Sequence, residues 1–198
     1  NSTTVIGHEL AHGVIQHTAN LVYRDQSGAL NESIADVFGA LTEQYLASQT
    51  ADAATWLIGS EIFTAAVQGV ALRNMLEPGT AYDDDVLGKD PQPGHMRDFV
   101  TMVEDNGGVH VNSGIPNRAF ALLACDLGGF AWERAGHIWY LALSRDLSST
   151  AAFVEFADAT VSAAEAEYGK TSEEVRAVQR AWRAVGVYDE QRGDPSRE

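Results

Sequence analysis

The first helical segment of the chain reads TTVIGHELAHGVIQHTA over residues 3–19. Apolar side chains recur in it at intervals of three and four residues, the spacing of an amphipathic helix with a wide buried face. They are Val5, Ile6, Leu10, Ala11, Val14 and Ile15. A serine or threonine at its start can cap the helix. The segment therefore predicts a long helix that packs against a neighbour.

A second long helix is predicted over residues 29–47, after a loop at residues 24–28. Helical spacing turns six of its apolar side chains inward. They are Leu30, Ile34, Val37, Phe38, Leu41 and Tyr45. Because the two segments are close in sequence, we expect the two helices to pack together.

The rest of the chain divides into a loop region and a helical third. Residues 69–114 lack periodicity and are rich in proline, glycine and aspartate, and a loop this long in a compact domain is usually functional. Beyond them, Pro116 and several glycines mark helix ends. Helices are predicted there over residues 119–127, 133–147 and 151–168, and a last one ends near residue 185. With no repeat and no long strand, the predicted fold is mainly α and bundle-like, with a charged, frayed tail at residues 189–198.

Composition limits the partners of the chain. Its 198 residues include 28 acidic and 13 basic side chains, a formal charge of −15. Such a surface repels phosphate groups, so we expect no nucleic acid and no membrane as partners. No stretch approaches the roughly 20 apolar residues of a membrane span. The single cysteine, Cys125, cannot form a disulfide within the chain.

Residues 8–12 read His-Glu-Leu-Ala-His, the pattern that indicates a reaction. Residues four apart in a helix point in nearly the same direction, so His8 and His12 can bind one metal ion, and zinc suits two imidazoles. Glu9, about 100° away around the helix, stays free to accept a proton from a water molecule. A catalytic zinc site has three protein ligands and one open position, so a third ligand is needed.

Two patterns compete for the third ligand. A metzincin needs glycine three residues and histidine six residues after the second histidine, but Ile15 and Thr18 stand there. The other pattern places a glutamate on the following helix, where Glu32 lies. Asp36, one turn further along the same face, can accept a hydrogen bond from the outer nitrogen of a ligating histidine. The sequence therefore predicts a zinc site of two histidines and one glutamate.

Three motifs carry a family resemblance. They are His8-Glu9-x-x-His12, Asn31-Glu32-x-x-x-Asp36, and DNGGVHVNSG at residues 105–114. Together they resemble the motifs of the thermolysin-like neutral metalloproteases. The resemblance runs from Val5 to about Tyr188. It implies that residues 1–188 form the C-terminal, helical catalytic lobe of a thermolysin-like zinc metallopeptidase.

The resemblance assigns further residues to the chemistry. It implies that Tyr23 and His110 stabilise the oxyanion of a tetrahedral intermediate, and that Asp105 orients His110. It also implies that Asn31 holds His12. A phenol, an imidazolium and a cation that converge on the reacting oxygen would supply the electrostatic stabilisation that peptide hydrolysis requires.

The same resemblance implies a substrate class. Arg73 matches the arginine that binds the substrate carbonyl beyond the scissile bond, and Leu72 and Val5 would line an apolar S1′ pocket. The implied substrates are peptides or proteins, cleaved before bulky apolar residues. The family's location implies an extracellular, secreted protein.

The chain departs from the family pattern in two respects that bear on its expected function. The β-rich N-terminal lobe, which forms the other wall of the cleft and presents an edge strand to the peptide, is missing. At the family's double calcium site, Thr4, Thr55 and Leu57 stand where acids are expected, although Glu43 matches one ligand. We therefore expect zinc as cofactor, a degraded calcium site, and an apolar stripe on the zinc helix that the missing lobe would cover, including some of Val5, Leu10 and Val14.

A zinc endopeptidase lobe is thus the predicted function, with Glu9 as base and then acid. A zinc aminopeptidase would need an acidic motif such as GAMEN, which the sequence lacks. An alternative from another class is a zinc-binding fragment or non-catalytic interaction domain that is inactive without its N-terminal lobe.

Overall fold

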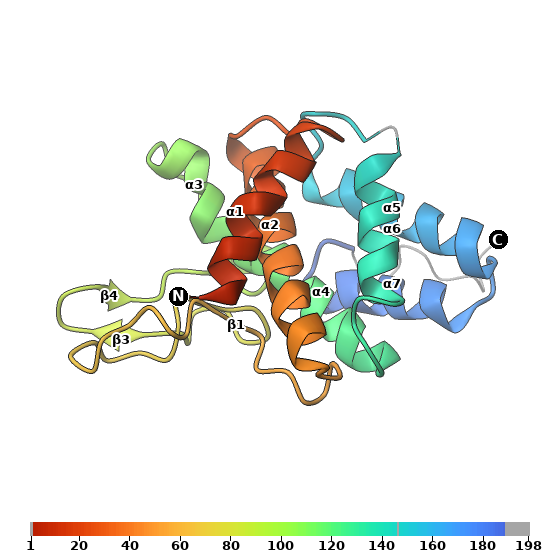
Figure 1. Ribbon diagram of the computed structural model, residues 1–198. Helices are drawn as coiled ribbons and strands as arrows, with labels where there is room; N and C mark the ends of the chain where they lie inside the picture. Colours follow the sequence, from red (N-terminus) through yellow and green to blue (C-terminus); the bar gives the residue numbers. More distant parts are fainter. Residues whose placement is uncertain (1, 146, 189–198) are drawn as a thin grey trace.

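The computed structural model of the chain describes residues 2–145 and 147–188 (Figure 1). Its helices are α1 (Thr3–Gln16), α2 (Asp25–Ala47), η1 (Met96–Asp98), α3 (Asp105–Asn112), α4 (Gly114–Leu127), α5 (Ala135–Ser144), α6 (Phe153–Tyr168) and α7 (Glu173–Ala184). Its strands are β1 (Leu57–Ile58), β2 (Arg73–Asn74), β3 (Asp83–Asp84) and β4 (Gly88–Lys89). The mainly α fold is confirmed for the described residues. The tail predicted at residues 189–198 lies outside them.

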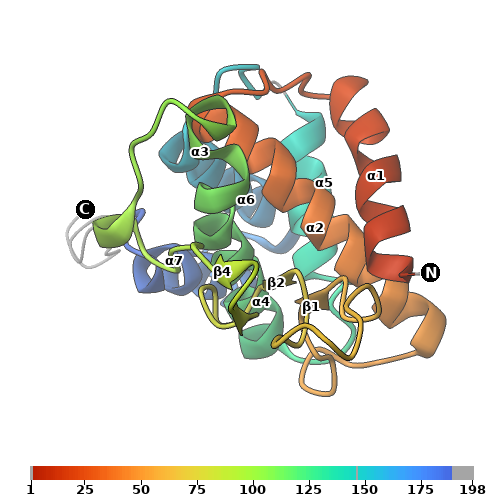
Figure 2. The same cartoon turned by 90° about the vertical axis from the view of Figure 1, so that its left-hand side faces the viewer.

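The first two helices run side by side, as Figures 1 and 2 both show. α1 ends at Gln16, somewhat before the predicted end, and α2 begins at Asp25, four residues before the predicted start. The loop predicted at residues 24–28 is therefore wrong for its last four residues. The N–H of Gly28 already donates to the carbonyl of Arg24, and the Ser27 hydroxyl donates to that same oxygen, so the helix closes one turn early.

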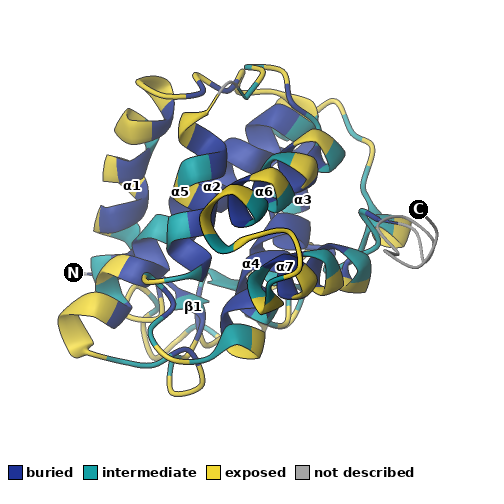
Figure 3. Cartoon of the chain, turned by 90° about the vertical axis from the view of Figure 1, so that its right-hand side faces the viewer, coloured by how far each residue is buried: buried dark blue, intermediate teal, exposed yellow. Residues whose placement is uncertain are grey.

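The predicted buried face of α1 is partly wrong. α1 buries Ala11 and Ile15, but Ile6, Leu10 and Val14 are 54%, 71% and 44% exposed. Neighbouring helices cover only one side of α1, and its outer side is exposed in Figure 3. The apolar stripe expected to be exposed on this helix is confirmed at Leu10 and Val14, whereas Val5 packs against the core.

The inward face of α2 needs one correction as well. Tyr45, predicted to point inward, is exposed, and its ring meets the edge of Trp132 at a centroid distance of 5.3 Å. The remaining predicted core positions of this helix are buried or half-buried. The tip of α2 therefore reaches the surface beside the loop before α5.

The second half of the molecule encloses an aromatic core. Trp139 of α5 and Trp182 of α7 stack with their ring centroids 5.6 Å apart and planes 5° from parallel. Phe120 and Phe156 meet the Trp139 ring edge-on. The indole N–H of Trp182 donates to Thr160 Oγ1 over 2.9 Å, which satisfies a polar group that burial would otherwise penalise.

The loop region carries two short antiparallel pairs. β1 pairs with β2 so that Ile58 faces Arg73, and β3 pairs with β4 in the hairpin that projects at the lower left of Figure 1. The first pair places Arg73 beside α2. The structure also contains a helix that the loop prediction missed, α3, whose first turn has positive φ at Asn106, Gly107 and Gly108.

Candidate metal centre

Three side chains from α1 and α2 converge. His8 and His12 lie one turn apart on α1, and their Nε2 atoms are 3.1 Å apart. Each Nε2 lies 3.5 Å from a carboxylate oxygen of Glu32 on α2, Oε2 for His8 and Oε1 for His12. His8 and Glu32 are buried, and His12 is partly exposed. The structure thus brings together the three residues predicted to bind a metal.

The outer nitrogen of each histidine has a partner on α2. His8 Nδ1 lies 2.8 Å from Asp36 Oδ1, and His12 Nδ1 lies 2.8 Å from Asn31 Oδ1. The Asn31 amide is oriented by its own donation to the carbonyl of Leu21. Because both partners are acceptors, each Nδ1 carries the proton and each Nε2 presents a lone pair.

This arrangement of donor atoms fits zinc. The lone pairs of the two imidazoles and the Glu32 carboxylate face one another, and no N–H lies between the two rings. The space between them therefore has a negative electrostatic potential, which a bound cation would neutralise. Ligand atoms about 2.0–2.2 Å from one tetrahedral zinc ion lie roughly 3.3–3.6 Å apart. The observed separations among His8, His12 and Glu32 are 3.1, 3.5 and 3.5 Å. The set is therefore spaced for a single small ion.

Asp36 is the centre of a buried network behind the cluster. Arg73 donates to it twice, from Nε to Oδ2 and from Nη2 to Oδ1, both over 2.7 Å. Asn117 of α4 donates from Nδ2 to Oδ2 over 2.8 Å. Burial opposes ionisation, but the charge of Arg73 and the bonds from His8 and Arg73 hold the Asp36 pKa well below its usual range. A fixed carboxylate therefore stands behind His8.

The same network acts on His8 and Arg73, the two basic side chains that face it. Burial lowers the pKa of His8, but the hydrogen bond and charge of Asp36 outweigh burial and raise it. Burial likewise opposes the charge of Arg73, while Asp36 raises the Arg73 pKa above its already high value. The surroundings of His8 thus favour positive charge at the cluster.

A second group approaches Glu32 from the other side. The Tyr23 hydroxyl donates to Glu32 Oε1 and lies 3.1 Å from His110 Nε2. His110 Nε2 is 3.5 Å from Glu32 Oε2. Burial, the hydrogen bond to Glu32 and its negative charge raise the Tyr23 pKa, so the phenol stays protonated at neutral pH. The predicted pair of oxyanion donors therefore lies beside the three residues predicted to bind the metal.

Asp105 holds His110 at two atoms. Its Oδ1 lies 2.5 Å from His110 Nδ1, and its Oδ2 accepts the His110 backbone N–H over 2.8 Å. The intervening turn requires glycine, since Gly107 and Gly108 have φ of 89° and 83°, and a Cβ on Gly107 would overlap the Asp25 carboxylate. The DNGG motif thus makes the turn that aims His110.

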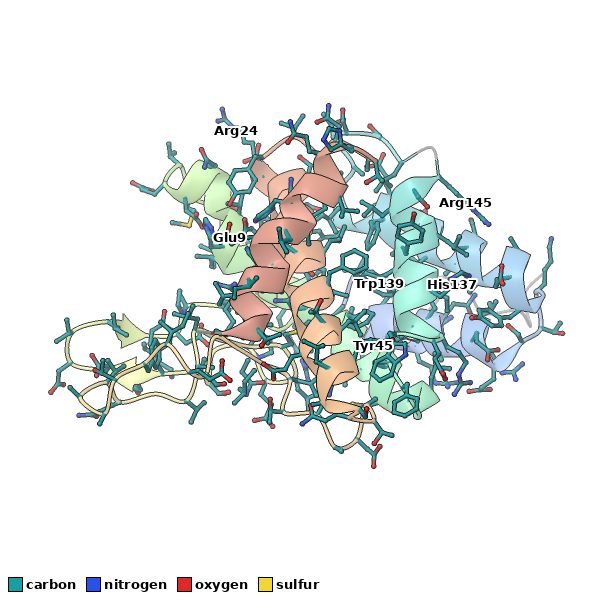
Figure 4. All side chains as sticks on the ribbon, in the orientation of Figure 1. Glu9, Arg24, Tyr45, His137, Trp139 and Arg145 are labelled. Atoms are coloured by element: carbon teal, nitrogen blue, oxygen red, sulfur yellow. The ribbon has the colours of Figure 1, made fainter. Side chains whose placement is uncertain are left out.

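The other predicted site residues lie around this centre. Glu9 is exposed and projects from α1 on the side where α3 lies in Figure 4. Leu72 is half-buried, with its backbone N–H bonded to the Ile58 carbonyl and its side chain against Gly59. Val5 is half-buried against the core. Sequence reasoning missed Asn117, because no motif links an α4 asparagine to an aspartate 81 positions away.

The two threonines at the expected calcium positions are engaged within the protein. Thr4 Oγ1 accepts the Gly59 N–H over 2.9 Å and lies 2.9 Å from Ser2 Oγ. Thr55 Oγ1 accepts the Leu57 N–H over 3.4 Å. The cavity between these residues and Glu43 has a volume of only about 10 Å³. Both threonine hydroxyls already accept backbone N–H groups, which reduces the oxygens left for an ion that takes six to eight oxygen ligands.

The fold and the cluster define a helical domain in which the two histidines of a His-Glu-x-x-His motif meet a glutamate of the next helix, a group that could hold a metal ion. The family model described as "Thermolysin metallopeptidase, alpha-helical domain" matches residues 19–187. The chain therefore belongs to the thermolysin metallopeptidase family, which confirms the predicted resemblance. No helix of the described residues is long and apolar enough to cross a membrane.

Named relatives support the same family. Protease PrtS of Photorhabdus sp. (strain Az29) is 54% identical over 94% of this chain and 50% of its own length. The "Extracellular metalloprotease" of Pectobacterium carotovorum subsp. carotovorum is 51% identical over 92% of this chain and 52% of its own length. The solved precursor of protealysin, a metalloproteinase from Serratia proteamaculans, superposes with a TM-score of 0.92 at 53% identity and covers 94% of this chain and 58% of its own. The chain thus spans about half the length of each of these three relatives.

Proposed function

We propose that this chain is the zinc-binding, catalytic lobe of a secreted metalloendopeptidase. The observation that carries the proposal is the convergence of the His8 and His12 Nε2 atoms on the Glu32 carboxylate, with Tyr23 and His110 directed at the same carboxylate. Relatives named as a protease and as an extracellular metalloprotease support both the activity and the location.

His8, His12 and Glu32 would hold the zinc ion. When bound, zinc supplies a Lewis acid that polarises the substrate carbonyl and lowers the pKa of water. Glu9 is the general base, which takes a proton from the attacking water and then gives it to the leaving amine. Its position next to His8 in sequence, but outside the ligand cluster, suits a group that handles protons without binding the metal.

Tyr23 and His110 stabilise the negative charge that develops on the carbonyl oxygen. The raised pKa of Tyr23 keeps its hydroxyl available as a donor. Asp105 fixes the His110 ring through Nδ1, so that Nε2 faces the reacting group. Loss of one such donor typically costs on the order of a hundredfold in rate.

Arg73 binds the substrate backbone in this proposal. Its Nε and Nη2 are engaged by Asp36, and Nη1 is the nitrogen that we assign to the substrate carbonyl beyond the scissile bond. Leu72 and Val5 contribute apolar surface to the pocket for the following side chain. Cleavage before bulky apolar residues follows from that lining.

A β-rich N-terminal lobe is the proposed partner within the whole protein. An apolar groove of about 570 Å³ runs along α1, lined among others by Ile6, Leu10, Val14, Leu46 and Tyr140. The exposed Ile6, Leu10 and Val14 line this one groove together, and apolar side chains gathered at the surface in this way indicate an interaction site. The relatives have about twice the length of this chain, which is enough for a second lobe. We assign the groove to that lobe, whose edge strand would form the other wall of the cleft.

The test compares casein hydrolysis by the complete protein and its Glu9→Gln variant. We expect the variant to keep its zinc content and to lose hydrolysis, since Glu9 is not a ligand. Glu133→Gln, which removes an exposed acid near α5, is the matched control and should keep wild-type turnover. Near-wild-type turnover of Glu9→Gln would overturn the assignment of the base.

A second arm compares the 198-residue chain alone with the complete protein. We expect the chain alone to bind zinc but to hydrolyse casein poorly, because a peptide held by one wall of a cleft samples many poses. If the complete protein also lacks Glu9-dependent hydrolysis, the alternative of a non-catalytic zinc-binding domain is correct.

A further inference from the structure

The backbone of His110 is held at both of its peptide groups. Its N–H donates to Asp105 Oδ2, as described above. Its carbonyl oxygen accepts two hydrogen bonds, from Gln92 Nε2 over 2.7 Å and from Ser113 Oγ over 2.9 Å. Gln92 is 18 residues away in the chain, and its amide reaches α3 from the loop region. This contact connects the loop region to His110, the residue that faces Glu32.

Gln92 stands on a rigid support. It is 6% exposed, and its backbone N–H donates to Asp90 Oδ1 over 3.1 Å. The other oxygen of the buried Asp90 accepts the N–H groups of Gly79 and Ala81, both over 3.1 Å. The Asp90 carboxylate accepts hydrogen bonds from three backbone N–H groups and so fixes the loop locally. The backbone from which the Gln92 side chain extends is therefore held in one position. The donor that reaches His110 is therefore preorganised.

The carbonyl oxygen of His110 would have a hydrogen-bond donor even without Gln92. Ser113 already donates to it, and Gln92 Nε2 also donates to Ser113 Oγ over 3.0 Å. The buried Oε1 of Gln92 has no hydrogen-bond partner among the described residues. A side chain kept only to satisfy hydrogen bonds would not leave its own acceptor unpaired in the interior. The engaged end of the Gln92 amide is therefore its donor, which is aimed at His110.

We propose that Gln92 is a positioning residue for His110, which holds the α3 backbone so that the imidazole stays directed at Glu32 and Tyr23. The need for such a hold is local. α3 is short, its first turn has positive φ, and the His110 side chain is 53% exposed, so few packing contacts restrain it. Without Gln92, the ring would keep its Asp105 bond but lose its fixed distance from the cluster. The proposed role in catalysis rests on the proposed function.

The first test uses Gln92→Met in the complete, zinc-loaded protein. Methionine has a similar length and no donor, so it fills the site without leaving an unpaired amide. We expect kcat to fall by about tenfold, the lower end of losses for groups that orient active-site residues, with KM within about twofold. Zinc content and melting temperature should stay close to wild type. Gln68→Met, at an exposed loop residue, is the control and should leave both kinetic parameters unchanged.

A double-mutant cycle separates positioning from a structural role. If Gln92 acts through His110, Gln92→Met should change kcat by less than about twofold in a His110→Ala background, since contacting residues couple. An equal loss of kcat in both backgrounds would overturn the proposal, as would a KM effect alone. Gln92→Glu, which replaces the donor by an acceptor of the same shape, is a second variant and should show the same coupling.

A measurement that does not depend on catalysis separates the positioning role of Gln92 from the proposed peptidase function. In the 198-residue chain labelled with ¹³C-histidine, we expect Gln92→Met to shift and broaden the His110 ring signals while the His8 and His12 signals stay in place. Unchanged His110 signals would overturn the positioning role. If the complete wild-type protein shows no Glu9-dependent hydrolysis, the proposed function fails, and the ring signals still decide whether Gln92 holds His110.

Discussion

Gly7 and Gly39 lie against each other where α1 packs on α2. A Cβ built on Gly7 would lie 3.0 Å from the Cα of Gly39, and one built on Gly39 would overlap the carbonyl oxygen of Thr4 and lie 3.2 Å from His8 N. The two backbones therefore approach as closely as glycine allows, at the turn that carries His8. The distance from that histidine to the α2 residues depends on this contact.

Gly39→Ala should separate the two helices. We expect a loss of about 1–3 kcal/mol in unfolding free energy, the usual cost of overpacking, together with weaker zinc binding. Thermal melting and zinc titration measure the two effects. Gly13→Ala is the matched control, because a Cβ there meets nothing within 4 Å. That variant should gain up to about 1 kcal/mol from helix propensity. Equal behaviour of the two variants would show that the helix contact does not set the site.

One zinc ion should bind per chain, and Glu32→Ala should reduce the zinc content after purification without chelator. The reason is that, among the described residues, three side chains converge to bind it, so the loss of one removes a third of the ligand set. Removing the metal from the wild type should lower its melting temperature, because a ligand that binds only the folded state stabilises it. Unchanged zinc content in Glu32→Ala would contradict the assigned ligand set.

Asp36→Asn should destabilise the fold by about 3–5 kcal/mol, the usual cost of breaking a buried ion pair, because Arg73 would keep its charge without its partner. Urea unfolding measures this loss. Asp126→Asn, at an exposed pair with Arg180, is the control and should change stability by no more than about 1 kcal/mol. Similar losses in both variants would contradict the central role of Asp36.

The same variant should alter the acid sensitivity of the metal-free chain. Burial raises the pKa of Asp36, but Arg73 and His8 lower that pKa by more than burial raises it. The pKa of Asp36 in the folded protein therefore lies below its value in the unfolded chain. Such a carboxylate contributes stability above about pH 4, its usual unfolded pKa, and this stability is lost as the pH falls. The unfolding free energy of the wild type should therefore decrease more below pH 4 than that of Asp36→Asn.

Calcium should have little effect on thermal stability. The Thr4 hydroxyl oxygen accepts a hydrogen bond from the Gly59 N–H. That bond joins α1 to the loop after β1 without an ion. Melting curves with calcium and with a calcium chelator should coincide, provided that the chelator does not remove zinc. A steep rise of the melting temperature at micromolar calcium would show that the matching of Thr4, Thr55 and Leu57 to calcium-ligand positions is wrong.

The sequence by itself determined the two helices on which the predicted metal ligands lie. His8 and His12 are one helical turn apart, and Glu32 and Asp36 lie one turn apart on the next helix. Helical periodicity acts within a few residues, so these relations can be read before any tertiary contact is known. The convergence of His8, His12 and Glu32 needed only that two neighbouring helices pack together.

Only the tertiary structure decided the groups behind that cluster and the face that α1 exposes. Asn117 reaches Asp36 from α4, and Gln92 reaches His110 from a loop without periodicity. Ile6, Leu10 and Val14 follow helical spacing as well as the buried residues do, yet they are exposed. Periodicity shows that a helix has an apolar face, but the neighbours that cover it, and the partners of its polar groups, depend on the paths of distant segments.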